Sequence, residues 1–297
     1  MMTARRDRDA AVATREAADT ARRIAVLLHA GIVPERAWTY VGEVDGGAVA
    51  TISARMSGGA RPADAIEAQG GPWVPLAAAW RIAEAVGAPL ADTLRAIAGA
   101  LQDGSETADD VTVALAEPTV TARIMLWLPV LGLLLGAVLG FDTIGVLIGN
   151  PLGITCLIAG IGLVVLARQW TRRLVRRARD LPIAPGLRAE LAAVALSGGA
   201  TIDRALRLVD DALGQDEDAA VERVLALSRR AGVPAAALLR ASAADARQRT
   251  RTEGRIRAVR LGSAMLLPLG LCTLPAFFLL GVAPMVLSVI TSTQLAW

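Results

Sequence analysis

Few side chains of this sequence are suited to chemistry. The chain has one histidine, His29, two cysteines, Cys156 and Cys272, and no lysine. His29 has no second ligand or nucleophile to serve, so we expect a surface or interfacial residue. Both cysteines lie inside apolar runs, which favours small hydrophobes over a disulfide or a metal site. A Walker phosphate loop requires lysine, and no GxSxG phrase occurs. The sequence therefore predicts no catalytic residue, cofactor or metal, and no enzyme.

Carboxylates gather at two places. The phrase DGSETADD, residues 103–110, is more typical of a helix boundary on a solvated turn than of a cation site. Asp142 lies between two apolar runs. It is either a buried ion or proton ligand, as acidic groups at membrane depth often are, or a solvated turn residue. Its position at the junction favours the turn.

The composition indicates membrane segments joined to water-soluble regions. Of the 297 residues, 54% are hydrophobic and 20% are charged. Soluble domains are nearer to about 45–50% apolar. The net charge of +3 and the aromatic content of 3% argue against nucleic-acid binding.

Three apolar runs are long enough to cross a bilayer, which takes about 20 helical residues. The arginine-rich flanks of these runs all fall on one side of the membrane, because the turn at Asp142 and the tail after residue 290 carry no arginine. The positive-inside rule then places the N-terminus and the soluble regions in the cytoplasm and the C-terminus outside. The three runs are residues 124–141, 143–167 and 261–290.

We expect an all-α membrane protein with two cytoplasmic helical bundles and three transmembrane helices. Prolines and a glycine in DLPIAPG mark a linker between the bundles. The expected segments are a first bundle (1–122), a hairpin of two spans (123–167), a basic flank and linker (168–187), a second, shorter bundle (188–260), a third span (261–290) and an exterior tail (291–297).

A glycine-centred phrase recurs in the soluble regions. HAGIVPERAW, GGARPADAI and VGAPLADTL place Gly31, Gly59 and Gly87 at intervals of 28 residues, each with a bulky apolar residue seven positions later. The same pattern occurs twice in the second soluble region, as GGATIDRAL and AGVPAAALL. A helix ends at a glycine that can adopt positive φ, and the next begins with proline or an acidic residue. Each phrase therefore predicts the corner of an antiparallel helical hairpin.

A larger repeat encloses these corners. RIAEAVGAPLADTLRA precedes the first apolar run, and LSRRAGVPAAALLRA precedes the third. The two phrases share Gly, Pro and Leu-Arg-Ala at matching positions, which predicts a duplicated unit of helical bundle followed by membrane helix. The second copy is shorter by about one hairpin and has Arg229 where the first has Glu84.

The order of these features resembles the F-type platform proteins of type II secretion and type IV pilus machines. LLHAGIVPERAW is similar to that family's LLxAGxPLxxAL phrase. AEAVGAPLADTLRAIA is similar to its GExxGxLxxxLxxLA phrase, with Glu84 and Gly87 on the Glu and the second Gly. The terminal LPLGLCTLPAFFLLGVAPMV resembles the Tad/Flp pilus branch.

The resemblance implies a scaffold in the bacterial inner membrane that couples a hexameric cytoplasmic ATPase to pilin extrusion, as a homo-oligomer or with a second F-type protein. Glu84, Gly87 and Asp92 are then candidates for a partner contact, with solvation of a helix surface as the equal alternative for the two acids. The basic block at Arg172, Arg173, Arg176 and Arg177 is a candidate for anionic lipid headgroups or an acidic face of the ATPase.

Three prolines, Pro268, Pro275 and Pro284, interrupt the last apolar run. Each removes a backbone hydrogen bond, so we expect a bent helix or two half-helices packed against the hairpin or another subunit. Two other classes are weaker alternatives: a small membrane transporter subunit and a membrane-anchored enzyme.

Overall fold

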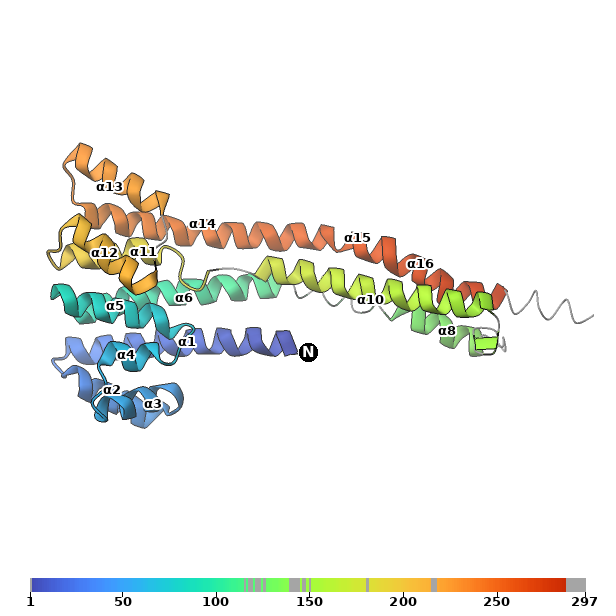
Figure 1. Cartoon of the computed structure of the whole chain (residues 1–297), viewed down its shortest axis with the longest axis horizontal. Coiled ribbons are helices and arrows are strands. Elements are labelled where there is room, and N and C mark those ends of the chain that lie inside the picture. The colour runs from blue at the N-terminus through green and yellow to red at the C-terminus, as the bar shows by residue number, and fades with distance from the viewer. Residues whose placement is uncertain are drawn as a thin grey trace, which may run out of the picture. The chain divides into compact units, whose positions relative to one another are not determined.

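The computed structural model describes residues 2–114, 116, 120, 124, 127–138, 145, 148–149, 151–179, 182–214 and 218–286. All regular elements among these residues are helical (Figure 1). The chain divides into two compact units. Unit 1 comprises Met1–Ala108 and Leu181–Thr252, and unit 2 comprises Asp109–Asp180 and Glu253–Trp297. Asp142, the tail 291–297 and residues 125–126 and 139–141 of the first predicted span (124–141) lie outside the described residues.

Unit 1 is a bundle of amphipathic helices. The helices of its first part are α1 (Met2–His29), α2 (Pro34–Asp45), α3 (Gly47–Ser57), α4 (Pro62–Glu67), α5 (Trp73–Val86) and α6 (Leu90–Ala114). Those of its second part are α11 (Leu187–Ser197), α12 (Ile202–Leu213), α13 (Ala219–Ala231) and α14 (Ala235–Ala264). The last residues of α6 and of α14 belong to unit 2.

One hydrophobic core runs through unit 1. Trp38 of α2 and Trp80 of α5 are fully buried, and their ring centroids lie 6.1 Å apart at a tilt of 51°. Such tilted aromatic pairs add to the stabilisation from burial. Leu191 of α11 and Leu239 of α14 are also fully buried in this core. Residues from both predicted soluble regions therefore share a single apolar interior.

The five predicted corners are confirmed. The five corner glycines all have positive φ, between 65° and 91°, a backbone conformation that residues with a Cβ rarely adopt. They are Gly31, Gly59, Gly87, Gly199 and Gly232. At four of them the amide of the next residue donates to the carbonyl five residues back; Ala88 N to Ala83 O, at 3.0 Å, is one case. This bond satisfies a carbonyl that the end of a helix would leave unpaired.

Four of the five corner glycines are followed by a fully buried core residue. Trp38, Ile66, Leu94 and Leu239, seven positions after four of the glycines, are fully buried. Seven residues are about two turns of helix, so the phrase specifies both the turn and the residue that anchors the next helix. The spacing links local backbone conformation to packing.

Unit 2 contains the apolar helices. Its described elements include α8 (Leu128–Val138), α10 (Pro151–Arg179), α15 (Leu266–Pro268), the π-helical η1 (Leu269–Thr273), α16 (Leu274–Phe277) and the π-helical η2 (Phe278–Val282). α10 packs against η1, α16 and η2, and α8 packs against η2. Gly132 and Gly281 allow the backbones of α8 and η2 to approach closely, because a Cβ on Gly132 would lie 3.4 Å from the Gly281 Cα. Small residues serve this purpose between membrane helices.

The three prolines lie in or beside irregular helix. Pro268 directly precedes η1, Pro275 lies between η1 and η2, and Pro284 follows η2. A proline cannot donate the usual bond to the carbonyl four residues back. A π-helical turn, with its i to i−5 bonds, re-pairs part of the backbone around such a gap. The described part of this segment, up to residue 286, packs against both α8 and α10.

Two helical stretches among the described residues have the length and apolarity to cross a membrane. They are Pro151–Arg177 and Ala235–Val286. The first of the three predicted spans contributes only α8 and isolated residues to the described structure. A third crossing stays a prediction.

Candidate functional site

The corner between α5 and α6 carries three of the predicted site residues. Glu84 lies in the last turn of α5, Gly87 ends this helix at a φ of 68°, and Asp92 lies in the first turn of α6. The Glu84 and Asp92 side chains are exposed, and Asp92 Oδ1 accepts a hydrogen bond from Arg95 Nη1 at 2.7 Å. The local turn thus brings both carboxylates to one end of unit 1, with Glu84 having no described ion-pair partner.

The corner between α11 and α12 packs onto this end of α5. Gly198 lies against Val86, so closely that a Cβ at Gly198 would collide with the valine side chain. The Arg204 guanidinium donates to the Ala85 carbonyl at 3.2 Å, and Arg240 Nη2 donates to Ser197 Oγ at 2.7 Å. Both corners lie at the same end of unit 1 in Figure 1. Two copies of the glycine phrase therefore form one composite surface.

The expectation for DGSETADD is wrong. Residues 103–110 continue α6 and contain no turn. Ser105 and Thr107 are buried and donate their hydroxyl hydrogens to the carbonyls of Gln102 and Asp103. Two of its four acids, Asp103 and Asp110, have arginine partners on α14, which stabilise their charge within the helix.

Arg247 of α14 is the centre of that pairing in unit 1. Its Nε lies 2.8 Å from Asp103 Oδ2, and its Nη1 lies 3.4 Å from Oε2 of Glu190 on α11. The Glu190 side chain is only 6% exposed, so the guanidinium supplies the charge that burial of a carboxylate requires. One arginine thus joins α6, α11 and α14.

Arg81 makes a similar tie within the first part. Its Nη2 lies 2.6 Å from Glu67 Oε2 and 3.2 Å from Asp64 Oδ1, both on α4. The hydrogen bond that Arg81 donates to the Glu67 carboxylate is the main reason that the pKa of Arg81 lies above its usual value. The guanidinium is therefore charged throughout the physiological pH range, and it fixes α4 on α5.

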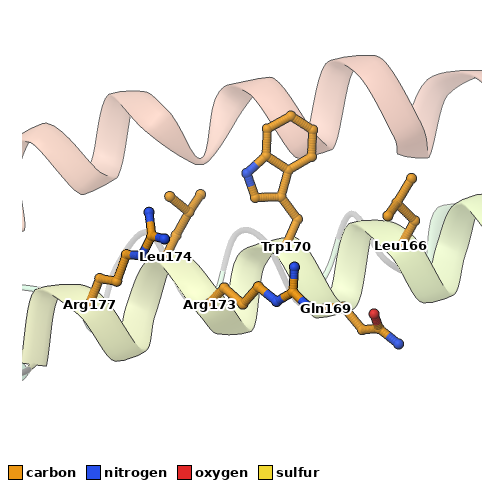
Figure 2. A pocket seen from close by; sticks show the side chains of 6 residues that line it. All are labelled: Leu166, Gln169, Trp170, Arg173, Leu174 and Arg177. Carbon is orange, nitrogen blue, oxygen red and sulfur yellow. The ribbon is translucent and has the colours of Figure 1, made fainter.

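The basic block on α10 borders a hollow in unit 2. This hollow has a volume of about 270 Å³ and is lined by Leu166, Gln169, Trp170, Arg173, Leu174 and Arg177. Figure 2 shows Leu166, Trp170 and Leu174 projecting from one side of α10, with Gln169, Arg173 and Arg177 beside them. Arg172 and Arg176, the other predicted residues of the block, are exposed but are not among the lining residues.

A second hollow, of about 460 Å³, lies between α1 and α2. It is mainly apolar, and Val26, Tyr40 and Val44 expose 59%, 41% and 80% of their surface there. Arg36 donates a hydrogen bond to the Tyr40 hydroxyl at 3.0 Å and lies 5.7 Å from the centre of its ring.

The family comparison covers part of the chain, from within α1 to the end of α8. Residues 20–138 match the family of type II secretion system (T2SS) protein F. No curated protein matches the chain. The protein F match begins in α1 of unit 1 and ends with α8 of unit 2. It includes the α5–α6 corner, the α1–α2 hollow and three of the five glycine corners.

Residues 20–138 are thus similar to protein F of type II secretion systems, and this match together with the two long apolar helices points to an inner-membrane protein. His29 is exposed at the end of α1, and both cysteines are free thiols, with Cys272 buried in η1. No group of three His, Cys, Asp or Glu suited to a metal occurs in the described part of the chain.

Sequence reasoning missed the contacts that connect the helices within the second part of unit 1. Arg188 on α11 pairs with Asp210 of α12 and donates to the Gly214 carbonyl at 2.9 Å, while Arg247 reaches Glu190. One signal was available: Glu190 is the only charge in the run ELAAVAL, and a carboxylate in an apolar helix face needs a partner.

Proposed function

We propose that this chain is the inner-membrane platform of a type II secretion or Tad/Flp (type IV-like) pilus machine, coupling a cytoplasmic secretion ATPase to pilin extrusion. The single observation that carries the proposal is the protein F match over residues 20–138, which joins a helical bundle to an apolar helix. The proline-punctuated end of the chain, similar to the Tad/Flp branch, supports that assignment. The protein acts as a scaffold and has no active site of its own.

The proposed topology has three spans. Unit 1 is cytoplasmic together with the N-terminus, and the C-terminus is exterior. Arginines in the C-terminal part of α10 and in α14, next to apolar helix in both cases, support this orientation by the positive-inside rule. A reporter fused after Trp297 is expected to be active only outside the cytoplasm.

The end of unit 1 formed by the α5–α6 and α11–α12 corners is the proposed contact for the ATPase. It carries an exposed carboxylate, Glu84, on a surface fixed by Gly87 and by the Arg204 hydrogen bond. Homo-oligomers, or hetero-oligomers with a second F-type protein, and pilin subunits complete the proposed machine. A rigid surface of this kind transmits motion because its helices do not move independently.

Deletion of the gene tests the function. We expect loss of surface pili or of secretion, and recovery when the full chain is supplied again. Pili and secretion that are unchanged in the deletion strain would refute the proposal.

Reversal of charge at the corner tests the contact. Glu84→Arg is expected to reduce copurification of the ATPase about tenfold, since an exposed charge at an interface is replaced by its opposite. Glu222→Arg, on the exposed side of α13, is the matched control and should leave copurification intact. Equal losses in both variants would show that the corner is not the contact.

A further inference from the structure

The hollow on α10 combines two kinds of surface. Leu166, Trp170 and Leu174, at intervals of four residues, form an apolar row. Gln169, Arg173 and Arg177 are also four residues apart and form a polar row beside the apolar one. Because residues four apart lie on the same face of a helix, the hollow has an apolar row next to a cationic row. This is the complement of a phospholipid, which has a charged headgroup and apolar chains.

The two arginines of the polar row, Arg173 and Arg177, are not neutralised by the described protein. Throughout the part of the chain that the structure describes, no carboxylate lies within ion-pair distance of Arg173 or Arg177. Both guanidinium groups are exposed. By contrast, Arg247, Arg255 and Arg257 of α14 each have an acidic partner. The charge at the hollow is therefore available to an anion from outside the chain.

The hollow also lies at the depth where phospholipid headgroups are expected. The uncharged part of α10, from Pro151 to Ala167, directly precedes it. Trp170 then occupies the boundary between apolar and basic residues, a position that tryptophan favours at the membrane surface. Over the next two turns, the helix carries four arginines, Arg172, Arg173, Arg176 and Arg177. An anion bound between Arg173 and Arg177 would therefore be at the cytoplasmic headgroup level.

We infer that this hollow binds one anionic phospholipid of the cytoplasmic leaflet, and the inference rests on the membrane placement in the proposed function. Arg173 and Arg177 hold the headgroup phosphate, since guanidinium groups donate to phosphate in a forked geometry. Gln169 adds a neutral donor. The first carbons of the acyl chains lie on Leu166, Trp170 and Leu174. The bound lipid fixes the register of α10 against the bilayer surface.

The test uses the full chain, purified in an uncharged detergent and titrated with dioctanoyl phosphatidylglycerol by calorimetry. Arg173→Gln/Arg177→Gln is expected to weaken binding roughly tenfold or more, because each arginine near an anionic lipid contributes substantially to the attraction. Arg172→Gln/Arg176→Gln is the matched control. It removes the same charge at the same spacing from the same helix but not from the hollow, and we expect a loss of about threefold at most.

Four results would overturn the inference. Equal losses in the two double variants would show general attraction to the basic helix and no site. Equal binding of dioctanoyl phosphatidylcholine would show that the anionic charge is irrelevant. Effective competition by glycerol 3-phosphate would show a site for free phosphate and not for a lipid. Loss of ATPase copurification in the hollow variant, with lipid binding unchanged, would assign the arginines to the ATPase.

The outcome is separable from that of the proposed function. Lipid titration requires neither the ATPase nor pili. A chain that extracts from membranes only with detergent and supports pili, but shows no preference for phosphatidylglycerol, overturns the lipid site alone. A chain found in the soluble fraction without detergent overturns the membrane placement itself.

Discussion

Two arginine-rich segments border apolar helix in this protein, and they differ in what their charges contact. In α14, Arg247 pairs with Asp103 and Glu190, and Arg255 pairs with Asp110. In α10, no described carboxylate pairs with Arg172, Arg173, Arg176 or Arg177. Similar composition thus serves two purposes. Arg247 and Arg255 of α14 connect helices of the fold, whereas Arg172, Arg173, Arg176 and Arg177 of α10 remain available to the membrane or to a partner.

The largest expected effect comes from breaking the pairing within α14. Arg247→Met leaves Glu190 buried without a counter-charge, which costs about 3 kcal/mol of unfolding free energy. Urea unfolding of the purified chain, followed by tryptophan fluorescence, measures this loss. Adding Glu190→Leu to the same chain should restore most of it, because the unpaired charge is removed. A single variant as stable as the natural chain would show that the pair does not stabilise unit 1.

The helix that carries the acidic partners Asp103 and Asp110, α6, packs closely at Gly104. A Cβ there would collide with the Ile183 carbonyl oxygen, so Gly104→Ala should destabilise the chain by about 2 kcal/mol. Gly99, in the same helix, has open space at this position. Gly99→Ala should therefore stabilise the protein by up to about 1 kcal/mol. Effects of the same sign in thermal unfolding would contradict the packing described at Gly104.

Exposed pairs of α14 should matter much less than Arg247. The Arg255 and Arg257 side chains are 59% and 45% exposed, and ion pairs at such positions contribute about 0–1 kcal/mol. Arg255→Gln/Arg257→Gln should lower the unfolding free energy by less than about 1 kcal/mol, and the loss should shrink further at high salt. A loss as large as that of Arg247→Met would erase the distinction between buried and exposed pairs.

The smallest effect on stability is expected in α10. Arg173→Gln/Arg177→Gln removes no described ion pair, so its unfolding free energy in uncharged detergent should stay within about 0.5 kcal/mol of the natural chain. The same variant should lose phosphatidylglycerol binding. A destabilisation above about 2 kcal/mol would indicate that these arginines support the fold as those of α14 do.

The hairpin corners were predictable because their determinants are local. A glycine with positive φ, a proline or acid in the next helix and a core residue seven positions later are all visible in the sequence, and Gly31, Gly59 and Gly87 follow this pattern. The all-helical architecture and the apolar stretches of α10 and of the C-terminal helices were predictable for the same reason: their periodicity and length are properties of single segments.

The contacts between distant segments were not predictable. The packing of Gly198 on Val86 depends on the absence of one side chain at a position that resembles any other corner glycine. DGSETADD was misjudged because the partners of its acids, Arg247 and Arg255, are far away in the sequence. Only the folded chain shows which charges are already paired, and therefore which arginines remain for partners.

The most direct test of the platform function is affinity copurification from native membranes. The full chain, tagged and extracted in mild detergent, is captured, and the bound proteins are identified by mass spectrometry. We expect a hexameric secretion ATPase among them, in amounts reduced by Glu84→Arg and not by Glu222→Arg. If no secretion ATPase copurifies under conditions that keep the chain folded, the proposed coupling of the ATPase to pilin extrusion is contradicted.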